Sequence, residues 1–519
     1  MPKLSIFRRI TATAAATVAV GLMLAGCSSS GGTTASNAGT TTSGGTYNVG
    51  IITPSGNIDP LTTSDYDTMW LVGLASANLI IANTSGKLEP QLATSWTQSA
   101  SKLQWTVTLR PGLKFSNGKS LTASDVVWTF NQILSPSSQS PAASSFDGIL
   151  KSVKATGTGT VVFTLDSAYS DFPYLLTGAN TWILPTGTDY TNWIKDPVGA
   201  GQFAVEKYTP GESVTYKKNP YYWDASAIDL SGVDLTFYSS AQDLLLAFQS
   251  GQIDQIQSTS DPSVNQTLGT SYRKQNVGYA KFDGITFNTT KAPFNNVNVR
   301  QAIAWALDRK AIVSTAYSGS AVAANDYATF PDYGTQPTGL TQREQNDAEV
   351  KQLLGGQKIS FTITTYQGEQ TLAELIQQQL QATGDFTVKL DVMTEAQYYG
   401  GSNSTTPWLN AEVTITDWAD RLPSQLESLI YASGSSWNAS HFSNKTLDNL
   451  TTQYEGTTDA ATKQSIANQI AQIEWTNVPV IVAAFEVDDV YFSNSVKGSF
   501  PNGLQFSGGF DFRGISVSS

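Results

Sequence analysis

The residue types best suited to chemistry in this chain are two carboxylates, Asp417 and Asp420, separated by Trp418 and Ala419. Paired carboxylates can act as the acid and the base or nucleophile of glycoside hydrolysis. A single carboxylate in a cleft with little water is instead a strong partner for an ammonium group. Because the two acids stand three residues apart beside a predicted strand end, we interpret them as one ligand contact and one helix cap, and we expect no enzyme activity.

Other catalytic arrangements have little support in the sequence. The chain has one histidine, His441, and one cysteine, Cys27. One chain can therefore form neither a disulfide framework nor a His/Cys zinc site. No G-x-S-x-G elbow is present, and His441 is the only imidazole available to a serine triad. We expect no cofactor and no metal.

Charge and composition narrow the classes of partner. Lys and Arg number 30, Asp and Glu number 42, and the formal net charge is −12. An acidic chain is a poor candidate for binding nucleic acid. Its acidity fits a protein that must stay soluble after export. A length of 519 residues is enough for two or three hydrophobic cores.

The N-terminus has the pattern of a processing signal. A positive head containing Lys3 precedes an apolar run over 10–24, which ends in Ala25-Gly26-Cys27. This order is typical of a secretory signal peptide, here residues 1–26, and a cysteine after small residues resembles a bacterial lipobox. We expect lipidation at Cys27 and a Ser/Gly/Thr-rich tether over 27–46. The alternatives are a soluble secreted protein with an incidental Cys27 and an uncleaved membrane anchor.

The elements that would position the site follow from hydrophobic periodicity. Between 88 and 134 the pattern predicts a strand with one buried face, formed by Leu103, Trp105, Val107 and Leu109. Two turns should follow, at Pro111-Gly112 and Asn117-Gly118. A helix should then start with a cap formed by Thr122 and Asp125. We also predict a helix over 66–81. A strand over 413–416 should run into the loop that carries Asp420, followed by a helix over 423–430.

Several ordered motifs resemble one known family. They are Leu109-Arg110-Pro111-Gly112-Leu113-Lys114-Phe115, Leu121-Thr122-Ala123-Ser124-Asp125-Val126-Val127, Pro197-Val198-Gly199-Ala200-Gly201, and Val299-Arg300-Gln301-Ala302-Ile303. This series is similar to the peptide/nickel class of extracytoplasmic solute-binding proteins, family 5, the receptors of ABC importers. The resemblance covers about 59–479, although Ala200 stands where the family usually has threonine.

The resemblance implies an α/β fold of the type II periplasmic-binding-protein kind. It consists of two lobes joined by two crossing strands that act as a hinge, with a third subdomain inserted in the first lobe. We expect lobe I at 47–280 with the insertion at about 79–182, lobe II at 281–485, and a C-terminal return to lobe I at 486–519. We expect Arg300 and Asp308 to have structural roles.

The resemblance also suggests where a solute would bind. In peptide-binding members an aspartate in a "gWxxDy" motif pairs with the free α-amino group, and we match Asp420 and Trp418 to that motif, although one residue separates them here instead of two. Arg421-Leu422-Pro423 departs from it, and Asp420 could instead cap the next helix. The other predicted ligand contacts are Asp417, Trp437, Tyr66 and Tyr398, with Tyr399 and Trp408 as further aromatic candidates. Nickel-carrying relatives use imidazoles, and a lone His441 does not make a nickel site.

These observations lead to a lipid-anchored receptor outside the cytoplasmic membrane. We expect it to be monomeric, to capture a peptide-like or amine-bearing solute, and to deliver it to ABC permease and ATPase subunits. The alternatives are an oligosaccharide receptor of the same fold, in which some of the 12 tryptophans would stack on sugars, a surface hydrolase, and a signalling or chaperone-like receptor without an importer.

Overall fold

One large mixed sheet runs through the computed structural model, which describes residues 44–54, 56–63, 65–257, 264, 267–501 and 510–518. Its strand order is β15-β14-β16-β12-β18-β11-β1-β10-β9-β8, with β13 paired to β18 and β17 paired to β12. The signal, the lipidated cysteine and most of the tether predicted at 1–46 lie outside the described residues. None of the helices in the described part is both long enough and apolar enough to cross a membrane.

The first end of the sheet contains the N-terminal strand. In this lobe, β1 is parallel to β10 and the β10-β9-β8 strands form an antiparallel meander. The elements are β1 (Thr46–Ile52), β8 (Phe203–Thr209), β9 (Ser213–Lys218), β10 (Gly232–Tyr238), β11 (Gln255–Gln257), α1 (Tyr66–Ala75) and α5 (Ala241–Gln249).

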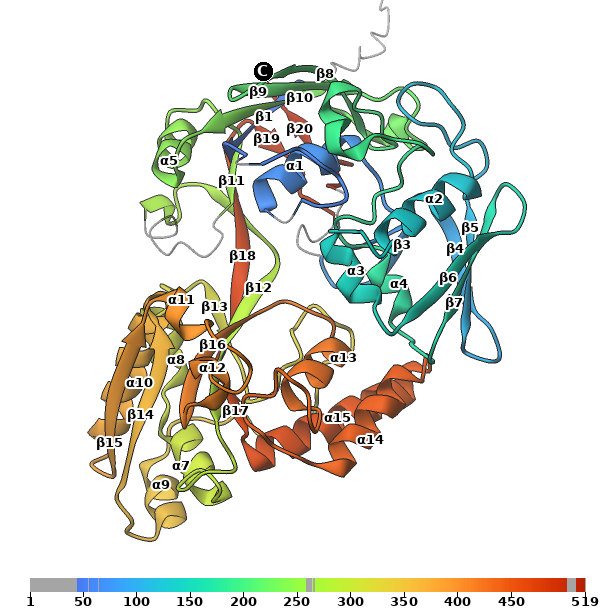
Figure 1. Cartoon of the computed structure of the whole chain (residues 1–519). Helices are drawn as coiled ribbons and strands as arrows, with labels where there is room; N and C mark the ends of the chain where they lie inside the picture. The colour runs from blue at the N-terminus through green and yellow to red at the C-terminus, as the bar shows by residue number, and fades with distance from the viewer. Residues whose placement is uncertain are drawn as a thin grey trace, which may run out of the picture. The chain divides into compact units, whose positions relative to one another are not determined.

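A separate antiparallel sheet is formed by the chain between α1 and β8. Its strand order is β4-β5-β7-β6, and helices pack beside it (Figure 1). The elements are β2 (Ile80–Ala82), β3 (Leu88–Pro90), β4 (Ala93–Gln98), β5 (Gln104–Leu109), α2 (Ala123–Ile133), α3 (Pro141–Phe146), β6 (Leu150–Ala155), β7 (Thr160–Leu165) and α4 (Phe172–Leu175). We call this region the inserted subdomain; its limits at about 79–182 remain a prediction.

The other end of the sheet belongs to the second lobe. There β14 pairs in parallel with β15 and β16, while β16 is antiparallel to β12. Strands and helices alternate in this lobe: α7 (Val297–Ala306), α8 (Arg309–Thr315), β13 (Ala321–Ala323), α9 (Asp347–Leu354), β14 (Ile359–Tyr366), α10 (Gln370–Ala382), β15 (Phe386–Met393), α11 (Glu395–Tyr398), α12 (Pro407–Asn410), β16 (Val413–Ala419), α13 (Pro423–Leu426), α14 (Lys445–Glu455), α15 (Ala460–Asn477) and β17 (Val480–Val482).

Two long antiparallel strands, β12 (Arg273–Phe287) and β18 (Ala484–Phe492), connect the lobes. Figure 1 shows them side by side between the two ends of the sheet. At one end β18 pairs with β11, and at the other β12 pairs with β16. This agrees with the expected fold of two lobes and two crossing strands, while the lobe boundaries at 280 and 485 remain predictions.

Much of the predicted local structure between 103 and 134 is present. Trp105, Val107 and Leu109 are buried on one face of β5, but Leu103 is 38% exposed because the strand begins only at Gln104. The expectation of a buried Leu103 was therefore wrong. The capping box at α2 forms as predicted, with the Thr122 N–H donating to Asp125 Oδ2 at 2.8 Å.

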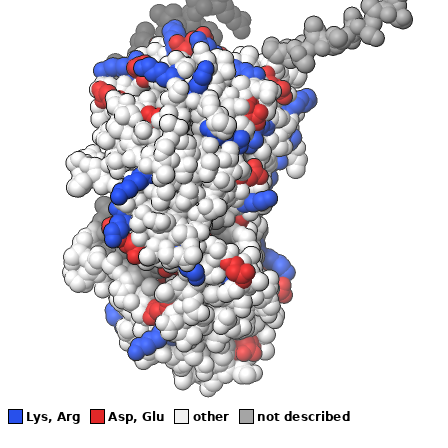
Figure 2. All heavy atoms as spheres, turned by 90° about the vertical axis from the view of Figure 1, so that its right-hand side faces the viewer, with Lys and Arg blue, Asp and Glu red and all other residues white. Residues whose placement is uncertain are grey.

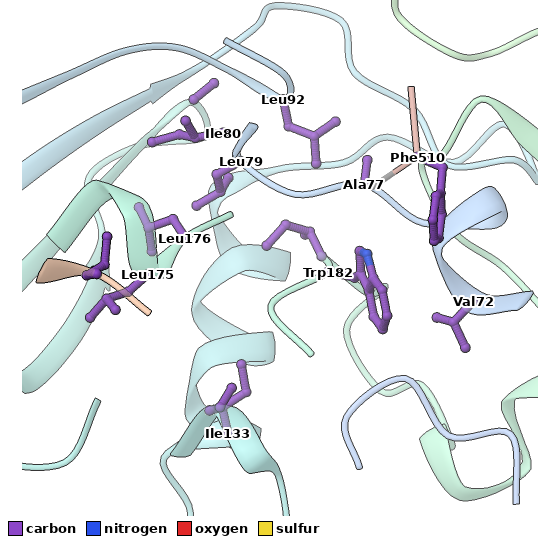
Figure 3. Close-up of a cluster of buried hydrophobic side chains, with 14 of the residues drawn as sticks. Val72, Ala77, Leu79, Ile80, Leu92, Ile133, Leu175, Leu176, Trp182 and Phe510 are labelled. Carbon is purple, nitrogen blue, oxygen red and sulfur yellow. The ribbon is translucent and has the colours of Figure 1, made fainter. Parts of the chain in front are cut away.

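The helix predicted over 66–81 ends earlier than expected. Helix α1 stops at Ala75, and residues 80–82 form β2 against β3. The break is stabilised by Asn78, whose N–H donates to Gln91 Oε1 at 2.8 Å and whose side chain donates to Gly178 O at 2.8 Å. Figure 3 shows how this extended segment places Leu79 and Ile80 in one apolar cluster with residues such as Ile133 and Trp182.

The structural roles predicted for two charged residues are confirmed. Arg300 donates to the carbonyl oxygens of Phe294, Asn477 and Val478. Asp308 caps α8 by accepting from the Ala311 N–H at 3.0 Å. Figure 2 shows one face of the molecule, where charged side chains are scattered among a majority of uncharged ones. This face has no broad basic surface of the kind that nucleic acids require.

Removing an aromatic ring from the inserted subdomain should destabilise it strongly. Phe130 is fully buried and its ring centroid lies 5.6 Å from that of Phe146 and 5.0 Å from that of Phe163. We expect Phe130→Ala to lower the free energy of unfolding by about 3–5 kcal/mol, because a large cavity would remain. Chemical denaturation measures the loss, with Leu103→Ala as the exposed control. Equal losses for the two variants would contradict this account of the core.

Candidate functional site

The loop that follows β16 carries the main predicted ligand contact. Strand β16 is held between β12 and β14, with Asp417 opposite Asp283 and Ala419 opposite Lys281. The last bond of this ladder is donated by the Asp420 N–H to Ala280 O at 2.9 Å. The backbone position of Asp420 is therefore determined by the same strand, β12, that crosses between the lobes.

Asp420 lines a cavity of about 360 Å³, which we call the first cavity. Its Oδ1 atom is shielded from solvent and has no hydrogen-bond partner within the described part of the chain. Burial, followed by the nearby charge of Asp332, raises the pKa of Asp420 well above its usual value, and hydrogen bonding from Tyr333 partly opposes the rise. A buried carboxylate oxygen without a partner is costly, so the site favours a proton or a bound cation at Oδ1.

The walls of the first cavity come from both lobes. The inserted subdomain contributes α3 and the segment from Tyr174 to Thr181, and α1 contributes Met69. The second lobe contributes Tyr333 and the loop from Ala419 to Leu422, while Ala280 comes from β12. The cavity therefore lies between the lobes, as expected for a solute enclosed by them.

A second cavity of about 440 Å³ adjoins the first. The two cavities share Ser145, Arg421 and Gln425 as lining residues. The remaining walls of the second cavity include an exposed tryptophan, two carboxylates and several hydroxyls: Trp437, Asp147, Glu455, Tyr169, Ser424 and Ser428. Together the cavities offer mixed apolar and polar walls, which suits an elongated polar solute.

Direct contacts between the inserted subdomain and the second lobe border the second cavity. The Tyr169 hydroxyl lies 3.0 Å from Ser424 Oγ, and Ser424 Oγ donates to Asp171 Oδ2 at 3.1 Å. Lys463 forms an ion pair with Asp171 and donates to Ser170 Oγ at 2.9 Å. The lobes therefore touch here as well as at the crossing strands.

The alternative role of Asp420 as a helix cap was wrong. Helix α13 begins at Pro423, and its N-cap residue is Leu422, which lies two residues beyond Asp420. No side chain caps this helix. Pro423 lacks an N–H group, so one of the donors that a cap would satisfy is missing.

Three tryptophans around the site form a cluster with different exposures. Trp418 is 4% exposed, and its ring centroid lies 6.3 Å from that of Trp408 and 6.1 Å from that of Trp437. Trp437 is 42% exposed and lines the second cavity. Trp418 lines neither cavity and instead packs against the other two rings.

Two further candidates, Asp417 and Tyr398, line neither cavity, and the side chain of the third, Tyr66, lies outside the described residues. Asp417 accepts from the Tyr366 hydroxyl at 3.0 Å and from the Tyr399 hydroxyl at 2.6 Å. Tyr398 is fully buried, and its hydroxyl donates to Ile415 O at 2.8 Å. Both residues thus have protein partners inside the second lobe. Tyr66 begins α1, but its side chain lies outside the described residues.

An ion-pair network beside the crossing strands was not anticipated. Lys281 lies 2.9 Å from Asp283 Oδ1, 2.8 Å from Glu369 Oε1 and 4.0 Å from Glu486 Oε2. Burial raises the pKa of Glu369 and of Glu486 to about 7. In the sequence these charges are spread between positions 281 and 486, so no local pattern could reveal their contact.

Asp332 and Tyr333 were also missed. Asp332 is 4% exposed, neither of its carboxylate oxygens has a hydrogen-bond partner among the described residues, and burial raises its pKa to about 7. In the sequence they stand in Pro331-Asp332-Tyr333-Gly334, which has the composition of an ordinary turn. This turn is distant from Asp420 in the sequence and lies beside it only in the folded chain.

His441 has no metal-site environment. Its Nε2 atom lies 3.0 Å from Leu409 O. Within the described ranges, no group of three or more His, Cys, Asp or Glu side chains is arranged to hold a metal ion.

Comparisons with known proteins agree with the fold. A family model described as "Bacterial extracellular solute-binding proteins, family 5 Middle" matches residues 87–440. The dipeptide-binding protein DppE of Bacillus subtilis is 27% identical over 447 residues, covering 79% of each chain. Heme-binding protein A of Haemophilus influenzae is 27% identical over 487 residues, covering 83% of this chain and 85% of the relative.

A solved structure extends the similarity to the whole fold. The unliganded open form of MppA, a periplasmic murein tripeptide binding protein, superposes with a TM-score of 0.82 at 19% identity, covering 91% of this chain and 97% of the other. The family match spans more than half of the sequence. The chain therefore belongs to family 5 of the bacterial extracellular solute-binding proteins, and it is a solute receptor of the kind that serves ABC importers.

Proposed function

We propose that this receptor captures a short peptide or a similar amine-bearing solute between its lobes and delivers it, unchanged, to an ABC permease. The observation that carries the proposal is the Asp420 carboxylate, which lines the interlobe cavity while its Oδ1 atom has no partner among the described residues. A ligand ammonium would supply the missing donor. Relatives named as dipeptide- and oligopeptide-binding proteins support this choice of solute.

The physical argument for an amine rests on the cost of isolated buried charge. Water stabilises a free carboxylate, and burial removes that stabilisation. An ammonium placed against Asp420 restores it with charge-assisted hydrogen bonds in a low-dielectric site. The first cavity is too polar at this point to suit a purely apolar solute, because Tyr333 and Arg421 also line it.

An oligosaccharide is the second candidate, and one observation favours it. The ring of Trp437 is 42% exposed at the wall of the second cavity, where it could stack on a sugar face. Asp420 would then accept from hydroxyl groups. A neutral hydroxyl relieves a buried carboxylate less than an ammonium does, so the amine-bearing solute remains the better fit.

Replacing Asp420 should weaken peptide binding selectively. We expect Asp420→Asn to reduce the affinity for short peptides by at least about tenfold, since one charge-assisted contact is lost. Isothermal titration calorimetry with pooled di- and tripeptides measures the change. Asp166→Asn is the matched control, because Asp166 is an exposed carboxylate of the inserted subdomain that lines neither cavity. Equal affinities of wild type and Asp420→Asn would end the amine proposal, and sugar binding without peptide binding would favour the second candidate.

Peptide binding should weaken as the pH falls through the range in which Asp420 takes up a proton, while the peptide α-amino group stays charged. Asp420 is surrounded by Asp332, Tyr333 and Arg421. Because the pKa of Asp420 is raised, its carboxyl group in the empty site keeps a proton to a higher pH than an ordinary carboxyl group does. An ammonium binds only the ionised form, so binding releases this proton and affinity rises with pH.

The released proton can be counted by calorimetry in buffers of unequal ionisation enthalpy. Asp420→Asn should release fewer protons than wild type at the same pH. An unchanged proton count in the variant would contradict the assignment of the titrating group.

Membrane attachment through Cys27 is part of the same proposal. A lipid on Cys27 would keep the receptor beside its permease, with the chain up to 46 as a tether. We expect Cys27→Ser to move the protein from the membrane fraction to the soluble exported fraction of a bacterial host, measured by immunoblotting. Ser28→Ala is the control and should stay with the membrane. A Cys27→Ser protein that remained in the membrane fraction would contradict lipid anchoring.

A further inference from the structure

The inserted subdomain supplies the hydrogen-bond donors that complete the end of a helix in the second lobe. Helix α14 ends at Glu455, and the last carbonyl groups of a helix have no partner within it. Ser170 Oγ donates to Tyr454 O at 3.3 Å, and the Ser170 N–H donates to Glu455 O at 2.6 Å. Lys102 Nζ donates to Gly456 O at 2.7 Å. Three consecutive carbonyl oxygens of the second lobe are therefore bonded by donors from the inserted subdomain.

Asp171 extends this junction to the next helix of the second lobe. Its side chain forms an ion pair with Lys463, in the first turn of α15, and accepts from Ser424 Oγ at 3.1 Å. Asp171 is the N-cap residue of α4, yet its side chain makes no capping bond to that helix. Within the described part of the chain, both of its carboxylate oxygens thus accept from the second lobe. Asp171 is 4% exposed, so its charge depends on these partners.

Lys463 joins the two halves of the junction. Besides its ion pair with Asp171, its Nζ atom donates to Ser170 Oγ at 2.9 Å and lies 4.5 Å from the ring centroid of Tyr454. The side chains of both partners of the ion pair are mostly buried. Salt screens such a pair much less than it screens an exposed one. Removing one partner of a buried pair is strongly destabilising, because the other charge is left without compensation.

This junction lies away from the strands that cross between the lobes. Figure 1 shows the ends of α14 and α15 beside the inserted subdomain, at a distance from β12 and β18. Ala280 of β12 lines the first cavity, whereas Ser424 and Glu455 of the junction line the second. The two adjoining cavities therefore extend from the crossing strands to the junction. Separation of the junction would widen the second cavity.

We propose that these contacts form a latch that holds the inserted subdomain against the second lobe when no solute is bound. The latch consists of the carbonyl groups that end α14 together with Lys102, Ser170, Asp171, Ser424 and Lys463. Every contact is between groups of the protein, so the latch does not depend on which solute the receptor carries. Its free energy therefore adds to that of the crossing strands in determining how often the lobes separate.

Hydrogen–deuterium exchange at the Ser170 amide tests the latch, because the acceptor of this amide, Glu455 O, belongs to the other lobe. The measurement uses the purified mature chain after any co-purified solute has been removed. We expect Lys463→Gln to speed exchange at Ser170 by at least about tenfold, since Asp171 loses its cation and the latch opens more often. Lys310→Gln removes an exposed lysine from the same lobe and should leave the rate unchanged.

Small-angle X-ray scattering then shows whether the lobes themselves separate. It is carried out on solute-free protein with Cys27→Ser, so that no lipid is attached. We expect Lys463→Gln to increase the radius of gyration, and Asp171→Asn, on the opposite side of the latch, to do the same. Circular dichroism establishes that each variant is folded, and the exchange rate of wild type requires no variant.

Two results would overturn the latch. The first is a Ser170 amide that exchanges in solute-free wild type as fast as an exposed amide. The second is an exchange rate at Ser170, or a radius of gyration, that neither Lys463→Gln nor Asp171→Asn changes. None of these measurements uses a solute, so either result would leave the proposed capture of an amine-bearing solute untouched.

Discussion

The pairing of β12 with β18 is the constraint on which the site depends. These antiparallel strands carry the sheet from one lobe to the other, and their register shifts between Asn276 and Gly278 and again between Tyr279 and Lys281. Such bulges bend a strand and change the direction of the residues beside them. Ala280 lies in the second irregular stretch, lines the first cavity and accepts the Asp420 N–H. The irregular part of β12 therefore fixes the backbone of Asp420, the residue that we propose binds the solute.

Some buried carboxylates in the interior are paired with cations of the protein, and others are not. Asp326 is buried between Arg309 and Arg343 and pairs with both, and Lys281 is surrounded by carboxylates. Asp420 and Asp332, by contrast, keep oxygen atoms without hydrogen-bond partners in the described residues. Unpaired buried groups destabilise a fold, and they persist at functional sites where a ligand completes them. Glu474, which lines neither cavity, also keeps both carboxylate oxygens without a hydrogen-bond partner in the described residues. The solute site is therefore marked by the unpaired oxygen of Asp420 together with the cavity that Asp420 lines.

Local physics explains how much of this could be predicted. The capping box of Thr122 and Asp125 and the alternation in β5 depend on neighbouring residues, so both were read correctly from the sequence. The helix predicted beyond Ala75 failed because Asn78 bonds to Gln91 and Gly178, which are distant in sequence. Tyr398 was a reasonable aromatic candidate, yet its hydroxyl is satisfied inside the second lobe. Asp332 gave no local signal, because its significance arises only from its position beside Asp420.

Some residues that line the solute cavities also form contacts between the inserted subdomain and the second lobe. Tyr169 and Ser424 hydrogen-bond across the lobes and also line the second cavity. A solute that reaches this cavity meets side chains that already join the inserted subdomain to the second lobe. Its contacts therefore add to interactions that hold the lobes together. The first cavity also has walls from both lobes. Since a ligand can shift a conformational equilibrium only through contacts that differ between the two states, solute contacts in either cavity can favour the closed arrangement of the lobes.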